Sequence, residues 1–118
     1  MTDPKTTGRQ LFRTAGIPFA PYDFDGPVQD NMSYLKLDYD LKTGQGAYLI
    51  RMRPGAATIA HTHRRREEYY IIDGDLIEDD GTRLGPGDYV IYQPGTRHNS
   101  RTETGCLLLG IDYSRATS

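Results

Sequence analysis

The sequence lacks several features that mark whole classes of protein. It contains no tryptophan, a single cysteine, Cys106, and no apolar run near the roughly 18 to 20 residues that span a membrane. One cysteine excludes a disulfide framework within the chain, and it also excludes a zinc ribbon or finger. The 14 basic and 16 acidic residues give a net charge of −2. Because there is no excess of positive charge, we expect neither nucleic acid nor a membrane as partner.

Turn residues and short extended runs are abundant instead. Thirteen glycines and seven prolines interrupt the chain. Within residues 34–41 the apolar residues 35, 37, 39 and 41 alternate with other side chains, which is typical of a half-buried strand. Further extended runs occupy residues 47–53, 58–63, 67–72, 75–78, 89–92 and 106–113, with turn signals between them. This spacing predicts an all-β sandwich or small barrel, and only residues 10–15 suggest a helical turn.

The chain length fits a single domain. Its 118 residues lie within the usual size of one domain and can bury a core of their own. Residues 1–10 are polar and lack the apolar stretch of a signal peptide. We expect one cytoplasmic domain over residues 1–118, with an N-terminal arm over residues 1–30 and a barrel over residues 31–113.

The three histidines lie in two short segments. His61 and His63 are two residues apart, so on a strand both imidazoles project from the same face. Glu67 follows after three arginines, and His98 comes about 30 residues later. Three imidazoles and one carboxylate suit a divalent transition metal such as Zn, Fe, Mn, Ni or Cu. The alternative is a group of surface histidines beside a charged loop.

Glycines at fixed offsets from these histidines carry a family resemblance. The segment Gly55-x5-His61-x-His63-x3-Glu67-x6-Gly74 resembles the first motif of the cupin family without a gap. The segment Gly87-x7-Gly95-x2-His98 is similar to the second motif, although Gln93 stands where proline is usual and Thr102 where asparagine often ends it. The resemblance covers residues 31–113 and implies a small antiparallel jelly-roll β-barrel with a metal in its mouth. The chain looks most like the branch that contains anti-sigma-factor cupin domains and acetylacetone-cleaving dioxygenases.

The resemblance also implies a metal site and a reaction. It assigns His61, His63, Glu67 and His98 as ligands of one divalent transition metal, with Glu67 preferred to its neighbour Glu68. Fe(II) is favoured, and Zn, Mn and Ni are possible. The implied function is an Fe-dependent dioxygenase that cleaves a small diketone-like or phenolic molecule. Two alternatives stay open: a non-catalytic metal-binding or ligand-sensing cupin, and a Zn, Mn or Ni isomerase, decarboxylase or hydrolase.

Strand parity suggests residues around the metal. Tyr69 shares the face of Glu67, so its hydroxyl is a catalytic candidate that would donate to a bound oxyanion, unless it is simply a core aromatic. One face of the preceding strand carries three candidates for the apolar wall of a substrate pocket: Tyr48, Ile50 and Met52. If Arg51 or Arg53 faced inward instead, the buried cation would indicate an anionic substrate.

Two surface features leave alternatives open. The run Arg64-Arg65-Arg66 is either a rim that attracts anionic ligands or a solvated loop offset by Glu67 and Glu68. A homodimer is expected, because a small open barrel has edge strands that need covering. The apolar segment 9–28 would then lie either across a neighbour's sheet or over its own barrel.

Overall fold

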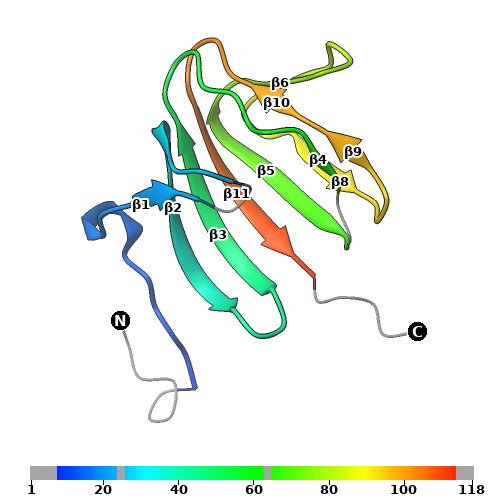
Figure 1. The fold of residues 1–118 in the computed structure, drawn as a ribbon. Helices are drawn as coiled ribbons and strands as arrows, with labels where there is room; N and C mark the ends of the chain where they lie inside the picture. The colour runs from blue at the N-terminus through cyan, green and yellow to red at the C-terminus, as the bar shows by residue number, and fades with distance from the viewer. Residues whose placement is uncertain (1–7, 24–25, 63–64, 114–118) are drawn as a thin grey trace.

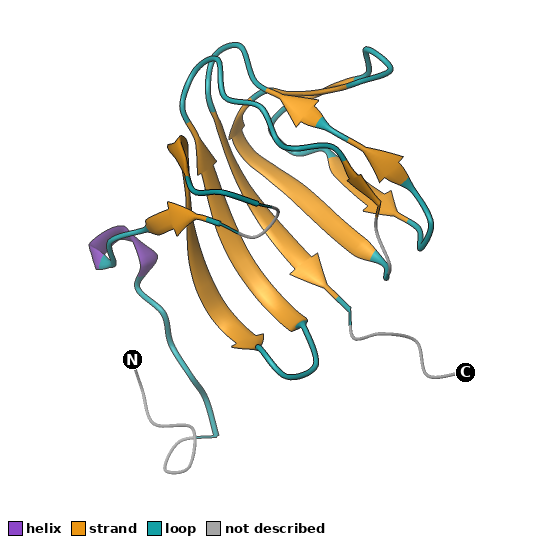
Figure 2. Cartoon of the chain, in the orientation of Figure 1, coloured by secondary structure: helices purple, strands orange, loops and turns teal. Residues whose placement is uncertain are grey.

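Extended strands dominate the fold. The structure is a computed structural model that describes residues 8–23, 26–62 and 65–113, and Figures 1 and 2 show its strands. A short 3-10 helix, η1 (Thr14–Gly16), replaces the helical turn predicted over residues 10–15. The strands are β1 (Ala20–Tyr22), β2 (Gln29–Asp40), β3 (Gln45–Met52), β4 (His61–Thr62), β5 (Glu67–Gly74), β6 (Leu76–Glu78), β7 (Arg83–Leu84), β8 (Tyr89–Tyr92), β9 (Arg97–His98), β10 (Ser100–Arg101) and β11 (Cys106–Asp112).

Among the described residues all strand pairs are antiparallel, and they form three sheets. The main sheet has the order β1-β2-β3-β11-β5-β8, a second has the order β10-β6-β7, and β4 pairs with β9. The four long strands of the main sheet form one curved wall in Figure 1, with the short strand β1 beside β2 and the other short strands beyond β5. The predicted all-β antiparallel jelly roll is confirmed. Within the described residues the three sheets do not join into one closed hydrogen-bonded barrel.

Alternate residues of the main sheet build the core. Ile50 of β3 and Ile71 of β5 both pair with Leu108 of β11, so their side chains project from one face of the sheet. Tyr48 and Met52 share this inner face, and all five side chains are buried. Burial of such apolar surface stabilises the fold by about 25 cal/mol for each Å² removed from water.

A β-bulge in β2 breaks the alternation that the sequence suggests. Lys36 pairs with Tyr48, but Tyr39 pairs with Gly46, so β2 has one residue more than β3 between these pairs. The extra residue brings Tyr39 onto the inner face, where its ring packs edge-on against Tyr48 at 6.0 Å. The prediction that residues 35, 37, 39 and 41 share one face is therefore wrong. Leu41 lies in the following turn and is 75% exposed.

Two glycines permit the close packing around this bulge. A β-carbon on Gly46, whose φ is +150°, would lie 2.2 Å from the carbonyl oxygen of Asp38. A β-carbon on Gly110 would lie 2.3 Å from the ring atom Cε2 of Tyr48. Any larger residue at either position would force the backbone or the tyrosine ring to move.

The N-terminal segment covers part of its own sheet. Strand β1 pairs with β2, and Tyr22 is buried with its ring edge-on to Tyr34 at 6.0 Å. The guanidinium of Arg51 lies 5.1 Å from the centre of the Phe19 ring. Among the described residues, no helix is long and apolar enough to cross a membrane.

Candidate functional site

The two histidine segments meet in the ladder of β4 and β9. His61 and His98 are direct Cα partners there, so the fold brings together residues that are far apart in the sequence. The side chain of His61 is not described, and His63 lies outside the described residues. The predicted meeting of the two segments is therefore seen in the backbone.

Glu67 and Glu68 lie on opposite faces of β5. Glu67 begins the strand and shares its face with Tyr69 and Ile71, which point into the core. Glu68 is 3% exposed on the outer face, where it accepts a 2.7 Å hydrogen bond from Nε of Arg66 and another from the hydroxyl of Tyr89. Glu67 therefore lies on the inner face of the sheet and Glu68 on the outer face.

His98 is held by a buried carboxylate. The side chain of His98 is 6% exposed, and its Nδ1 lies 3.0 Å from Oε2 of Glu78, whose side chain is 10% exposed. The hydroxyl of Ser100 donates to the same oxygen at 2.9 Å, and the hydroxyl of Tyr92 donates to Oε1. The Tyr92 ring also stacks on the imidazole at 4.1 Å between centres. One nitrogen and one face of the imidazole are thereby fixed.

The electrostatics of this group favour a charged carboxylate and a neutral phenol. Burial would raise the pKa of Glu78, but hydrogen bonds with His98, Tyr92 and Ser100 outweigh it, so the pKa is lowered overall. Burial, followed by the hydrogen bond to Glu78, raises the pKa of Tyr92. At neutral pH, Glu78 is therefore ionised and Tyr92 carries its proton.

Buried tyrosines on the inner face interact with two carboxylates, Glu67 and Asp112. Tyr69 makes a side-chain hydrogen bond with Glu67, and burial followed by the charge of Glu67 raises the pKa values of both Tyr69 and Tyr48. The hydroxyls of Tyr48 and Tyr39 donate to the two carboxylate oxygens of Asp112 at 2.8 and 3.2 Å. Burial, then the charge of Asp112, raises the pKa of Tyr39 to about 12. These phenols are protonated donors at neutral pH.

The residues predicted to form the pocket wall are core residues. Tyr48, Ile50 and Met52 are each 2–3% exposed and belong to the buried cluster, whereas Arg51 and Arg53 are exposed. The alternative in which an inward-facing arginine binds an anionic substrate is therefore not supported. Whether the three core residues contact a substrate stays a prediction.

The arginine run contacts the chain's own groups. Nη1 of Arg65 donates to the carbonyl of Thr43 at 3.1 Å, and Arg66 forms the ion pair with Glu68. Arg64 lies outside the described residues. These contacts favour the solvated loop over the anion-attracting rim for Arg65 and Arg66.

Sequence reasoning missed Glu78, Tyr92 and Asp112. Glu78 pairs with Ser100 across β6 and β10, and Ser100 is two residues beyond His98 on a strand-like segment. That alternation was a usable signal for Ser100, but nothing in the sequence specified the register of β6.

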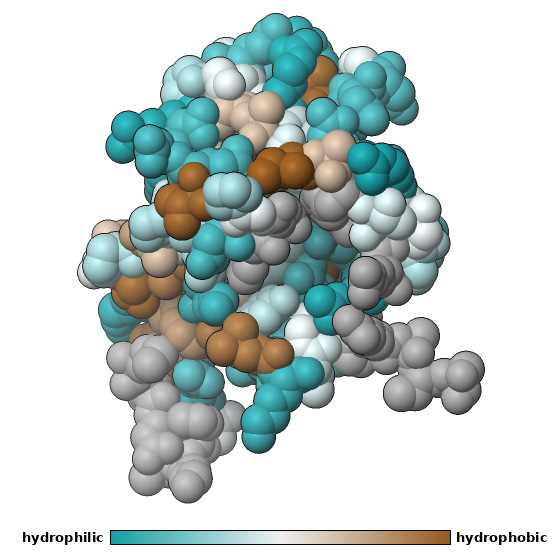
Figure 3. Space-filling view, viewed as in Figure 1, coloured by the Kyte–Doolittle hydropathy of each residue, from teal (hydrophilic) through white to brown (hydrophobic). Residues whose placement is uncertain are grey.

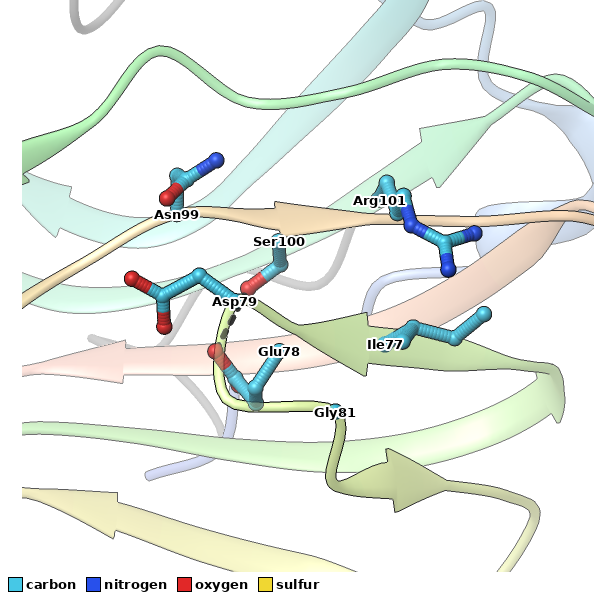
Figure 4. Close-up of a pocket in the computed structure, with 7 residues that line it drawn as sticks. All are labelled: Ile77, Glu78, Asp79, Gly81, Asn99, Ser100 and Arg101. Atoms are coloured by element: carbon cyan, nitrogen blue, oxygen red, sulfur yellow. Dashed lines mark hydrogen bonds between the residues drawn. The ribbon is translucent and has the colours of Figure 1, made fainter.

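Glu78 and Ser100 also line a surface pocket of about 200 Å³ between residues 77–81 and 99–101, drawn in Figure 4.

The described donor groups suit a divalent metal. Among the described residues, which include neither His63 nor the side chain of His61, no three His, Cys, Asp or Glu side chains form a ready metal cluster. The two predicted ligands whose side chains are described, Glu67 and His98, have the chemistry of metal ligands. Glu67 supplies carboxylate oxygens. His98 has the Glu78 carboxylate at its Nδ1, which is the usual arrangement behind a metal-bound histidine.

Comparisons with known proteins agree with this fold. The chain is similar in structure to an RmlC-like cupin from Shewanella frigidimarina NCIMB 400, with a TM-score of 0.72, 19% identity and coverage of 93% of this chain and 94% of that chain. It is similar to the Rhodobacter sphaeroides complex of SigE with the anti-sigma ChrR (TM-score 0.68, 20% identity, 93% and 54% covered). It is also similar to an acetylacetone dioxygenase from Acinetobacter johnsonii (TM-score 0.74, 13% identity, 88% and 73% covered).

Sequence comparison identifies the family. No curated protein matches the chain. The model of the ChrR cupin-like domain, however, matches residues 10–111, which is most of the chain. The structural similarities show a shared fold alone, since their sequence identities are low. Taken with the all-β jelly roll, the family match shows that the chain belongs to the ChrR cupin-like family.

Proposed function

We propose that this domain binds one divalent transition metal through His61, His63, Glu67 and His98 and acts on a small molecule. The observation that carries the proposal is the buried contact between Glu78 and His98, at a strand pair that also contains His61. A carboxylate behind one ring nitrogen orients the imidazole and makes the other nitrogen a better ligand.

The proposed reaction is Fe(II)-dependent oxidative cleavage of a diketone-like or phenolic substrate. Two or more histidines with one carboxylate are typical ligands of non-haem iron, and Zn, Mn or Ni would also be accepted. The bound metal would supply Lewis acidity toward substrate oxygens and, as iron, reactivity with O2. The similarity to an acetylacetone dioxygenase supports this choice of substrate class.

The chain's own residues would position the substrate and exclude water. The hydroxyl of Tyr69, which is hydrogen-bonded to Glu67, would hold that carboxylate or turn to donate to a substrate oxygen. Ile50 and Met52 give the interior an apolar wall that suits a small uncharged diketone. Because burial keeps Tyr69 protonated, its hydroxyl would be the donor to a substrate oxygen, whereas the single proton of the Tyr48 hydroxyl is already donated to Asp112.

Oxygen uptake tests the reaction. We expect protein loaded anaerobically with Fe(II) to consume O2 when acetylacetone or a phenolic acid is added. The same protein carrying His98→Ala should consume it no faster than free Fe(II). Equal rates for the wild type and free iron, across both substrate types, would contradict the dioxygenase proposal.

A sensing role is the second candidate, and the ChrR cupin-like family match favours it. In that case the domain would bind metal stoichiometrically but leave O2 uptake unchanged with every substrate. Zn as the resident metal would direct attention to sensing or to isomerase, decarboxylase or hydrolase chemistry. The cytoplasm remains the proposed location.

We also propose that the chain forms a homodimer through the outer face of its main sheet. Tyr70 and Ile72 of β5 and Tyr89 and Ile91 of the edge strand β8 are 41–53% exposed there. The face drawn in Figure 3 carries separate hydrophobic areas divided by hydrophilic ones. Light scattering should give twice the chain mass of 13.3 kDa, and a monomer mass would exclude the dimer.

A further inference from the structure

Glu78 is the centre of a hydrogen-bonded group that joins three short strands. It ends β6, its side chain is 10% exposed, and it has one close contact each from Tyr92, His98 and Ser100. Tyr92 belongs to β8, His98 to β9 and Ser100 to β10. Both carboxylate oxygens are used, because Oε1 accepts from Tyr92 while Oε2 faces Ser100 and His98.

The chemistry of the contact decides which imidazole nitrogen is available as a ligand. An ionised carboxylate can only accept hydrogen bonds, so Nδ1 of His98 must carry the hydrogen of the 3.0 Å contact. In a neutral imidazole with its hydrogen on Nδ1, the lone pair is on Nε2. Nε2 is also a buried atom, as is Oε1 of Glu67.

Neighbouring side chains fix the orientations of the Glu78 carboxylate and the His98 imidazole. Glu78 and Ser100 are direct partners in the ladder of β6 and β10, and Figure 4 shows their side chains joined by a hydrogen bond. Tyr92 acts twice, because its hydroxyl donates to Glu78 while its ring lies against the His98 ring, 23° from parallel. The carboxylate and the imidazole are thus fixed by separate strands.

We infer that Glu78 is a positioning residue for the metal, which sets the tautomer and orientation of His98 so that Nε2 faces the ligand position. This inference rests on the proposed metal site. Other paired acids of the chain differ in their partners: Glu68 is paired with Arg66, and Glu103 is paired on the surface with Arg83 and Arg101. An arginine holds no lone pair for a metal, so those acids have no comparable role.

Metal affinity of Glu78→Gln tests the inference. The variant keeps the size of the side chain and removes its charge. We expect Co(II) and Zn(II), measured by competition with a chromophoric chelator, to bind roughly 10- to 100-fold more weakly than to the wild type. The visible absorption spectrum of bound Co(II) should also change. Glu103→Gln removes an equivalent charge from an exposed acid and should bind both ions as the wild type does.

Ser100→Ala provides a second variant if Glu78→Gln does not fold. It removes one donor to Oε2 of Glu78 and leaves the carboxylate in place, so a smaller loss of affinity is expected. A purely structural role for Glu78 would lower the unfolding midpoint of the metal-free protein without altering the affinity or the Co(II) spectrum.

The outcomes separate this inference from the proposed function. Strong metal binding by the wild type, its loss in His98→Ala and its weakening in Glu78→Gln or Ser100→Ala would support both. Wild-type affinity and an unchanged spectrum in the two Glu78-directed variants would overturn the positioning role alone. If neither ion bound the wild type, the metal site and the inference would fail together.

Discussion

Two buried carboxylates of this chain, Glu68 and Glu78, are held in similar ways but beside different partners. Each is largely removed from solvent, and each accepts a hydrogen bond from a tyrosine hydroxyl, of Tyr89 and Tyr92 respectively. The basic partner of Glu68 is Arg66, on the outer face of the main sheet. The basic partner of Glu78 is His98.

The basic partner determines whether each carboxylate only stabilises the fold or also supports metal binding. The arginine is always charged, and once its carboxylate is satisfied the pair can only stabilise the fold. The imidazole uses one nitrogen for its carboxylate and has a second nitrogen that can ligate a metal. Glu68 and Glu78 are alike in burial and in accepting a tyrosine hydrogen bond. The basic partner therefore identifies Glu78 as the carboxylate that belongs to the candidate site.

The largest expected effect comes from the adjacent residues Glu67 and Glu68. We expect Glu67→Gln to weaken Zn(II) and Co(II) binding at least roughly 10-fold, because a direct ligand matters no less than the groups behind it. Glu68→Gln should leave metal affinity unchanged, since its side chain is on the opposite face. Chelator competition measures both. Equal losses in the two variants would break the distinction between the faces.

The next largest effect is a loss of stability when the packing of the inner face is disturbed. Gly110→Ala would place a β-carbon 2.3 Å from the ring of Tyr48, so we expect the free energy of unfolding to fall by about 1–3 kcal/mol. Gly85→Ala is the matched control, because a β-carbon there meets nothing within 4 Å. Urea denaturation compares them, and an equal stability of the two variants would contradict the packing described.

A smaller and pH-dependent effect is expected for Glu68. The hydrogen bond from Tyr89, followed by that from Arg66, lowers the pKa of Glu68 from 4.5 in spite of burial. A carboxylate whose pKa is lower in the folded protein than in the unfolded chain stabilises the fold at any pH above its unfolded pKa. This stability is lost as the pH falls through the folded pKa. At pH 7, Glu68→Gln should therefore cost about 1 kcal/mol in the free energy of unfolding.

The same comparison below pH 4.5 checks the sign. As the wild-type carboxylate becomes protonated, the stability difference from Glu68→Gln in urea denaturation should shrink. A difference that stayed constant or grew on acidification would show that the charge of Glu68 does not stabilise the outer face.

Much of the fold could be predicted from the sequence, because periodicity and turn residues are local signals. The spacing of residues 47–53 and 67–72 gave two long strands near their observed bounds, and alternation placed Glu67 and Tyr69 on one face. The bulge in β2 could not be predicted, because it depends on the close approach of Gly46 to another strand.

The short strands explain why the contact between Glu78 and His98 was not predicted. Strands β7, β9 and β10 have two residues each, too few to show any period. Glu78 reaches His98 only through the pairing of β6 with β10, so the contact depends on register rather than on sequence spacing. Long-range register of this kind is set by the packed fold.

The central claim is that His61, His63, Glu67 and His98 hold one metal, and elemental mass spectrometry tests it most directly. The protein would be purified anaerobically without chelators and offered Fe(II) and then Zn(II), beside His98→Ala. We predict close to one metal ion per chain in the wild type and a large loss in the variant. Metal-free wild-type protein, or an unchanged metal content in His98→Ala, would contradict the claim.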